Sequence, residues 1–224
     1  MLRKITVICI AFFMIVSLTG CNSEDDKEIG ETTTTTKAPR EFTESKGIIK
    51  YFAIDGEKVA LPETVGEYVS YLEKIGTVEL GDTKKSIKEA DKMDANEIAS
   101  MTSVLNVFTS GSDYHEFGIN YFNPEDKKID VADASVSRIT LIYDIYSELS
   151  EDLLINTIVL VTSGGEIPLN GKTTTADIMD VLGAPIQNTD GYLKYTDEAG
   201  FTYKFATENK KAILTKVQID FPKK

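Results

Sequence analysis

The sequence predicts an α+β fold built from two tandem repeats, each a helix packed on a small antiparallel sheet in the order strand-helix-strand-strand-strand. Two observations predict it. A β-branched segment, a turn, a Thr-x-x-acid cap and a short apolar helix ending at Gly occur after residue 46 and again after residue 150. Strand-like segments follow each helix. Because a four-stranded sheet can bury one face under one helix, each copy is expected to form a two-layer unit.

Residues 1–20 are expected to form an export signal. Arg3 and Lys4 precede an apolar run over residues 5–18, and the small residues Thr19 and Gly20 follow it. A charged start, an apolar core and small residues at the end are typical of a secretory signal. The run is shorter than the ~20 residues that a membrane-spanning helix needs, which disfavours an uncleaved anchor helix.

The end of this signal, Leu18-Thr19-Gly20-Cys21, resembles the lipobox of bacterial lipoproteins at every position. The resemblance implies attachment of a diacylglycerol to Cys21, cleavage before it, and a lipid-anchored location on the extracytoplasmic face of the cell membrane. An ordinary secreted protein with an incidental Cys is the alternative. Since Cys9, the other of the two cysteines, lies inside the signal, no disulfide is expected in the mature chain.

Residues 21–45 are expected to be a disordered tether. The segment is rich in charged residues and Ser, and contains the threonine run Thr32–Thr36. Such a composition buries too little apolar surface to offset the entropy of ordering. A glycosylated Thr-rich stalk is the alternative.

The first repeat is expected over residues 46–149. A strand over Ile48–Ile54 and a turn precede Thr64 and Glu67, which have capping-box spacing. Gly76 stands where a helix should end. Strands are then expected over residues 104–108, 114–122 and 136–143, after a charged stretch from residue 81 to residue 103.

The second repeat is expected over residues 150–224. A β-branched strand over residues 155–161 precedes Thr174 and Asp177, again with cap spacing, and Gly183-Ala184-Pro185 stops the helix. Three strands are expected over residues 192–196, 201–205 and 212–221, the first two joined by a hairpin loop.

Residues 178–185, Ile-Met-Asp-Val-Leu-Gly-Ala-Pro, with Tyr192-Leu193-Lys194-Tyr195 and Tyr203-Lys204-Phe205, resemble the repeat of the β-lactamase-inhibitor-like and outer-membrane-assembly lipoprotein (SmpA/OmlA) superfamily. The chain is also similar to uncharacterised Gram-positive lipoproteins that open with Asp-Gly-Lys and Leu-Pro-x-Thr. Residues 55–58 and 61–64 carry that likeness, with Glu57 inserted. The first copy departs from the Leu-Gly-x-Pro pattern, because Ile75-Gly76-Thr77-Val78 stands there.

No catalytic, cofactor or metal site is expected. The single histidine, His115, has no Cys partner for the common zinc sites, and neither Gly-x-Ser-x-Gly nor Ser-x-x-Lys occurs. The acidic loop over residues 123–133 lacks EF-hand spacing. A weak calcium site in this loop is left as an alternative to a solvated loop.

Charge and aromatic content favour a binding role. A net charge of −12 disfavours nucleic acid as a partner. Ten Tyr occur without any Trp, and we expect Tyr192, Tyr195 and Tyr203 to line an interface, unless these rings pack under the helices. The expected function is a non-catalytic module that binds another envelope protein. The alternatives are a cell-envelope hydrolase that uses carboxylates and a solute-binding lipoprotein.

Overall fold

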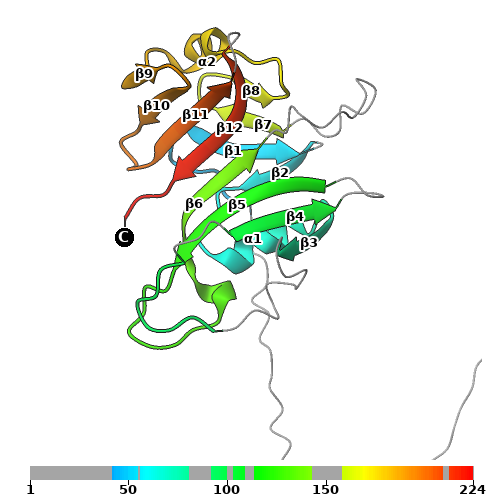
Figure 1. The fold of residues 1–224 in the computed structure, drawn as a ribbon, viewed down its shortest axis with the longest axis vertical. Helices are drawn as coiled ribbons and strands as arrows, with labels where there is room; N and C mark the ends of the chain where they lie inside the picture. The colour runs from blue at the N-terminus through cyan, green and yellow to red at the C-terminus, as the bar shows by residue number, and fades with distance from the viewer. Residues whose placement is uncertain are drawn as a thin grey trace, which may run out of the picture. The chain divides into compact units, whose positions relative to one another are not determined.

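Strands make up most of the fold, which is mixed α and β (Figure 1). The computed structural model describes residues 42–54, 56–80, 92–99, 103–108, 114–142, 158–208 and 212–223, with the backbone alone at 80, 103–108 and 114–116. The elements of the first half are β1 (Ile49–Ile54), β2 (Glu57–Ala60), α1 (Val65–Leu72), β3 (Thr77–Leu80), β4 (Ser103–Phe108), β5 (Tyr114–Phe122), the 3-10 helix η2 (Val131–Asp133) and β6 (Ser135–Ile142). Those of the second half are β7 (Ile158–Thr162), β8 (Glu166–Leu169), α2 (Thr175–Leu182), β9 (Gln187–Thr189), β10 (Tyr192–Thr196), β11 (Thr202–Glu208) and β12 (Ile213–Asp220).

The strands form two antiparallel sheets that both halves of the chain share. One sheet has the order β2-β1-β7-β8, and the other has the order β3-β4-β5-β6-β12-β11-β10-β9. The pairs β1–β7 and β6–β12 join the two halves at the middle of each sheet. The sequence predicted a small sheet for each half, with the first strand in it. Instead, the two-stranded hairpins β1–β2 and β7–β8 pair with each other, since a hairpin alone is only marginally stable.

The helices begin where their caps predict. Thr174 accepts a hydrogen bond from the amide of Asp177, whose carboxylate accepts one from the Thr174 amide at 2.7 Å, so the capping box is complete. At the start of α1, the Thr64 hydroxyl accepts a hydrogen bond from the backbone amide of Glu67 at 3.2 Å. The longer Glu67 side chain reaches one residue further back and accepts from the Glu63 amide at 2.9 Å.

The first turn of each helix is tied to the start of the last strand in its half. The Val65 amide donates to the Ala134 carbonyl at 3.0 Å, and Thr64 bridges to Ser135 at the start of β6. In the second half, the Thr175 amide donates to the Ala212 carbonyl at 3.3 Å, and Thr174 bridges to Ile213 at the start of β12. The caps therefore fix each helix against the sheet as well as starting it.

The core lies between the two sheets and α1. The ring of Tyr68 in α1 makes edge contacts with Phe52 of β1 and Phe117 of β5, each with ring centroids 6.5 Å apart. All three side chains are fully buried, as is Ile178 of α2. None of the helices in the described part of the chain is long and apolar enough to cross a membrane.

Candidate functional site

Four neighbouring strands, β10, β11, β12 and β6, turn alternate side chains into the core and onto the opposite side of the sheet. The core side carries residues such as Leu193, Phe205, Val217 and Ile139, all with no exposed surface. We call the opposite side the open face. Strand parity places on it Tyr192, Lys194, Thr196, Thr202, Lys204, Ala206, Glu208, Lys216, Gln218, Asp220 and Arg138, together with Ile142 and the buried Thr140.

Strand register brings three lysines of the open face together. Lys194 on β10 lies directly opposite Lys204 on β11, and Lys216 on β12 lies opposite Ala206, two residues along β11 from Lys204. Cross-strand and diagonal neighbours on one face are within reach of long side chains. We call Lys194, Lys204 and Lys216 the lysine cluster.

An aromatic ring borders the lysine cluster. Tyr192 pairs with Ala206 across the strands, and the Lys204 ammonium lies 4.1 Å from the centre of the Tyr192 ring. At the other end of the open face, Arg138 forms an ion pair with Asp220, which also accepts hydrogen bonds from the amide of Gln218. The open face thus has an ion pair at one end and, at the other, a group of cations beside a tyrosine, with the acid Glu208 at the end of β11.

Two of the three predicted interface tyrosines lie in the core, so their assignment to an interface is corrected. Tyr195 is 4% exposed, and its hydroxyl donates to the Gly183 carbonyl at the end of α2. Tyr203 is fully buried. Both alternate with lysines and share the parity of Leu193 and Phe205, so both face the core. Tyr192 has the opposite parity and lies on the open face.

The carboxylate of Asp197, in the β10–β11 turn, holds the entry of the chain into β1. It accepts hydrogen bonds from the Ile48 amide at 2.9 Å, the Phe201 amide at 3.0 Å and the Tyr203 hydroxyl at 2.6 Å. Burial and this hydrogen bond raise the pKa of Tyr203 above its usual value. A Cβ on the neighbouring Gly47 would lie 2.2 Å from the Tyr203 hydroxyl oxygen. No local sequence pattern indicates the contact between Ile48 and Asp197, because the two residues are 149 positions apart.

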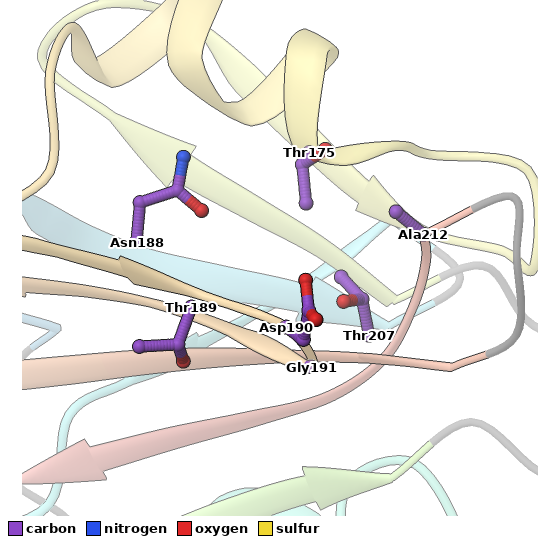
Figure 2. Close-up of a pocket in the computed structure, with 7 residues that line it drawn as sticks. All are labelled: Thr175, Asn188, Thr189, Asp190, Gly191, Thr207 and Ala212. Atoms are coloured by element: carbon purple, nitrogen blue, oxygen red, sulfur yellow. The ribbon is translucent and has the colours of Figure 1, made fainter.

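A polar cleft of about 650 Å³ lies between the start of α2, the β9–β10 turn, the end of β11 and the start of β12 (Figure 2). Its lining consists of Thr175, Asn188, Thr189, Asp190, Gly191, Thr207 and Ala212. Among the described residues of that lining, Asp190 is the one with an ionisable side chain. Hydroxyl, amide and carboxylate groups suit hydrogen bonding to a small polar molecule. A hydrolytic pair of carboxylates would need a second acid beside Asp190.

The acidic loop over residues 123–133 is held by the Asn123 side chain and by contacts with residues 93–97. Asn123 is buried, and its amide donates to the carbonyls of Asp94 and Lys127, each at 2.8 Å. Lys128 forms an ion pair with Asp94 at 2.9 Å. In the described part of the chain, no three His, Cys, Asp or Glu side chains gather where they could hold a metal ion.

The predicted signal and most of the predicted tether, with Cys21, lie outside the described residues. The last tether residues that are described include Phe42, whose ring makes an edge contact with Tyr51 at 5.4 Å, while the Lys58 ammonium lies 4.8 Å from the Tyr51 ring. No protein-family model, no curated protein and no solved structure matches the chain.

Proposed function

We propose that this chain is a lipoprotein, anchored through Cys21 to the extracytoplasmic face of a bacterial cell membrane, and that it binds another envelope protein without catalysis. The lipobox-like sequence Leu18-Thr19-Gly20-Cys21 supports the anchor. The open face supports the binding role and is the observation that carries it.

The open face suits a macromolecule better than a small ligand. Its four strands are hydrogen-bonded into the interior of an eight-stranded sheet, so the backbone that presents its side chains is fixed before binding. The face carries Tyr and Arg, which are enriched at protein interfaces, together with Thr and Gln that can hydrogen-bond. Small-molecule sites, in contrast, are usually concave and mostly apolar.

A duplicated ancestral unit accounts for the arrangement of the elements. Within the described residues, each half runs strand, strand, helix and then four strands, and the first half adds the 3-10 helix η2 before its last strand. Each half also ties a Thr cap to the first residue of its last strand, Thr64 to Ser135 and Thr174 to Ile213. The equivalent strands occupy mirrored positions in the order of both sheets. These matches support two tandem repeats, as does the likeness of the second half to the superfamily of inhibitor-like repeats.

A solute-binding lipoprotein is the second candidate, because the polar cleft around Asp190 could accept a small polar ligand. This role is tested by adding sugars and amines to the protein and measuring its melting temperature at each ligand concentration. A rise in melting temperature that Asp190→Asn abolishes would support a solute site. A carboxylate hydrolase has no such support in the described residues, since one acid alone lines the cleft.

Photo-crosslinking in intact cells tests protein binding. A crosslinkable residue would replace Tyr192 or Thr196 on the open face, and, as a control, Glu125 in the exposed loop. We expect a discrete protein adduct from Tyr192 and Thr196 and none from Glu125. The proposal fails if the open-face positions give no adduct, or only the diffuse adducts that Glu125 gives.

The anchor has its own test. Cys21→Ser should release the protein to the medium or leave an uncleaved precursor, because no thiol remains to accept the lipid. Cell fractionation and the mass of the N-terminal peptide distinguish these outcomes. Cleaved Cys21→Ser protein that stays in the membrane and needs detergent for release would contradict lipidation.

A further inference from the structure

We infer that the open face recognises an acidic polypeptide segment, which the lysine cluster holds by charge while Tyr192 contacts its backbone and side chains. This inference rests on the proposed function and adds to it the chemistry of the partner. It concerns the part of the open face on β10, β11 and β12.

The lysine cluster is electrostatically unfavourable in the protein alone. Lys194 and Lys204 are direct cross-strand neighbours, and like charges in that position destabilise a sheet. Lys216 adds a third positive charge at the diagonal position. Among the described residues, no carboxylate forms an ion pair with any of the three. An anion between these ammonium groups would relieve their mutual repulsion.

The surroundings of the lysine cluster fit a peptide. Tyr192 is half-buried, and the Lys204 ammonium lies over its ring, so the ring has a defined position beside the charges. Thr196, Thr202 and Gln218 add neutral hydrogen-bonding groups on the same face. An extended peptide places alternate side chains roughly 7 Å apart. The same spacing separates Lys204 from Ala206, the residue opposite Lys216, because these two residues of β11 are two positions apart.

The charge of the whole chain favours a short acidic segment over an extended anionic surface. The chain has a net charge of −12, while the lysine cluster covers three neighbouring strands, about 10 Å across. An anionic bilayer or a long polyanion would extend beyond the Debye length of about 8 Å and meet the acidic remainder of the protein. A segment with two or three acids is short enough to contact the lysine cluster without reaching most of the acidic surface.

Fluorescence anisotropy with defined probes tests the inference. The probes are a labelled peptide of alternating Glu and Thr, the matched Gln and Thr peptide, vesicles containing phosphatidylglycerol, and polyphosphate. The test protein carries K194Q, K204Q and K216Q. The matched control carries K46Q, K127Q and K172Q, three exposed lysines outside the open face with the same loss of charge. Circular dichroism and thermal unfolding verify that both variants fold.

We expect the Glu/Thr peptide to bind the wild type and the control equally, and the lysine-cluster variant roughly tenfold more weakly. Binding should weaken as salt rises, and the Gln/Thr peptide should bind poorly to all three proteins. Equal weakening in both variants would overturn the inference. Tighter binding of the vesicles or polyphosphate than of the peptide would also overturn it.

Crosslinking from Tyr192 in the lysine-cluster variant separates this inference from the proposed function. Loss of the protein adduct in that variant, but not in the control, supports both. An adduct that persists unchanged overturns the acidic partner and leaves protein binding in place. No adduct in the wild type overturns the proposed function itself.

Discussion

The hydroxyl of Tyr68 lies between the two sheets without a hydrogen-bond partner within the described part of the protein. Burial raises the pKa of this hydroxyl above its usual value, so it stays neutral. An unpaired buried polar group costs roughly 1–3 kcal/mol. The ring itself is needed, because it contacts Phe52 and Phe117 on the two sheets.

Tyr68→Phe should therefore raise the free energy of unfolding by about 1 kcal/mol, since it removes the unpaired hydroxyl and keeps the ring. Urea unfolding at neutral pH measures the change, and Tyr68→Leu, which removes the ring, should lower stability. A Phe variant less stable than the wild type would mean that the hydroxyl has a partner such as buried water.

Gly47→Ala should lower the free energy of unfolding by about 1–3 kcal/mol, because the added Cβ overlaps the Tyr203 hydroxyl and the Asp197 carboxylate. Adding Tyr203→Phe should recover part of that loss, since the nearest clashing atom, 2.2 Å from the Cβ, is removed. A double-mutant cycle by chemical denaturation measures the coupling. Additive effects of the two changes would contradict direct contact between these sites.

At the scale of single residues, the alternation of side chains along a strand is the pattern that predicts whether a side chain is buried or exposed. Lys194 and Lys204 alternate with Tyr195 and Tyr203, so parity alone separates charges from buried rings. Aromatic content pointed instead to Tyr195 and Tyr203 as interface residues. The meeting of Lys194 with Lys204, and of both with Lys216, depends on register between strands, which no single segment determines.

Helix starts are the features that local sequence predicts best, whereas α1 ends at Leu72 and not at Gly76 as predicted. Thr174 and Asp177 form their box within four residues, and Gly183, with φ of 77°, ends α2 as expected. The hydrogen bonds from the Thr174 amide and hydroxyl lower the pKa of Asp177 below its usual value.

Asp177 should therefore contribute stability that is present above its unfolded pKa of about 3.9 and is lost as pH falls through the lower folded pKa. We expect Asp177→Asn to be less stable than the wild type at pH 6, and the difference to shrink towards pH 2. Denaturant midpoints across this range test it. If the difference in stability between Asp177→Asn and the wild type did not change with pH, the charge of Asp177 would not be its cause.

Strand partners could not be predicted from the same local patterns. The apolar residues of β1 and β7 predict strands, but the choice between a strand in the same half and one about 110 residues away is set by tertiary packing. The short strands β2 and β8 have four residues each and directly follow a turn, so local sequence does not distinguish them from a connection. The sequence does not predict the edge strands β3 and β9, because segments of four and three residues are too short to show an alternating pattern.

On the scale of the whole molecule, both sheets depend on both halves. Without the second half, β1 and β6 would each lose a neighbour from the middle of a sheet, which exposes unpaired backbone groups and apolar surface. Separate fragments covering 46–149 and 150–224 should therefore fail to fold alone. Far-ultraviolet circular dichroism and thermal unfolding of each fragment, and of an equimolar mixture, test this. A cooperative transition in either fragment alone would contradict it.

The position of β1 also determines how the domain would respond to mechanical load. If residues 21–45 tether the domain to a membrane, as we propose, the pull acts on the chain just before β1, which is hydrogen-bonded on one side to β2 and on the other to β7. Force along this strand acts on both rows of hydrogen bonds in shear, so they must break together and not one after another. The Phe42–Tyr51 ring contact and the hydrogen bond from the Ser45 amide to the Lys50 carbonyl would bear tension first. The Asp197 carboxylate, which is bonded to the Ile48 amide, would follow. With this arrangement, the domain would resist unfolding from its N-terminal end when a bound partner pulls on it.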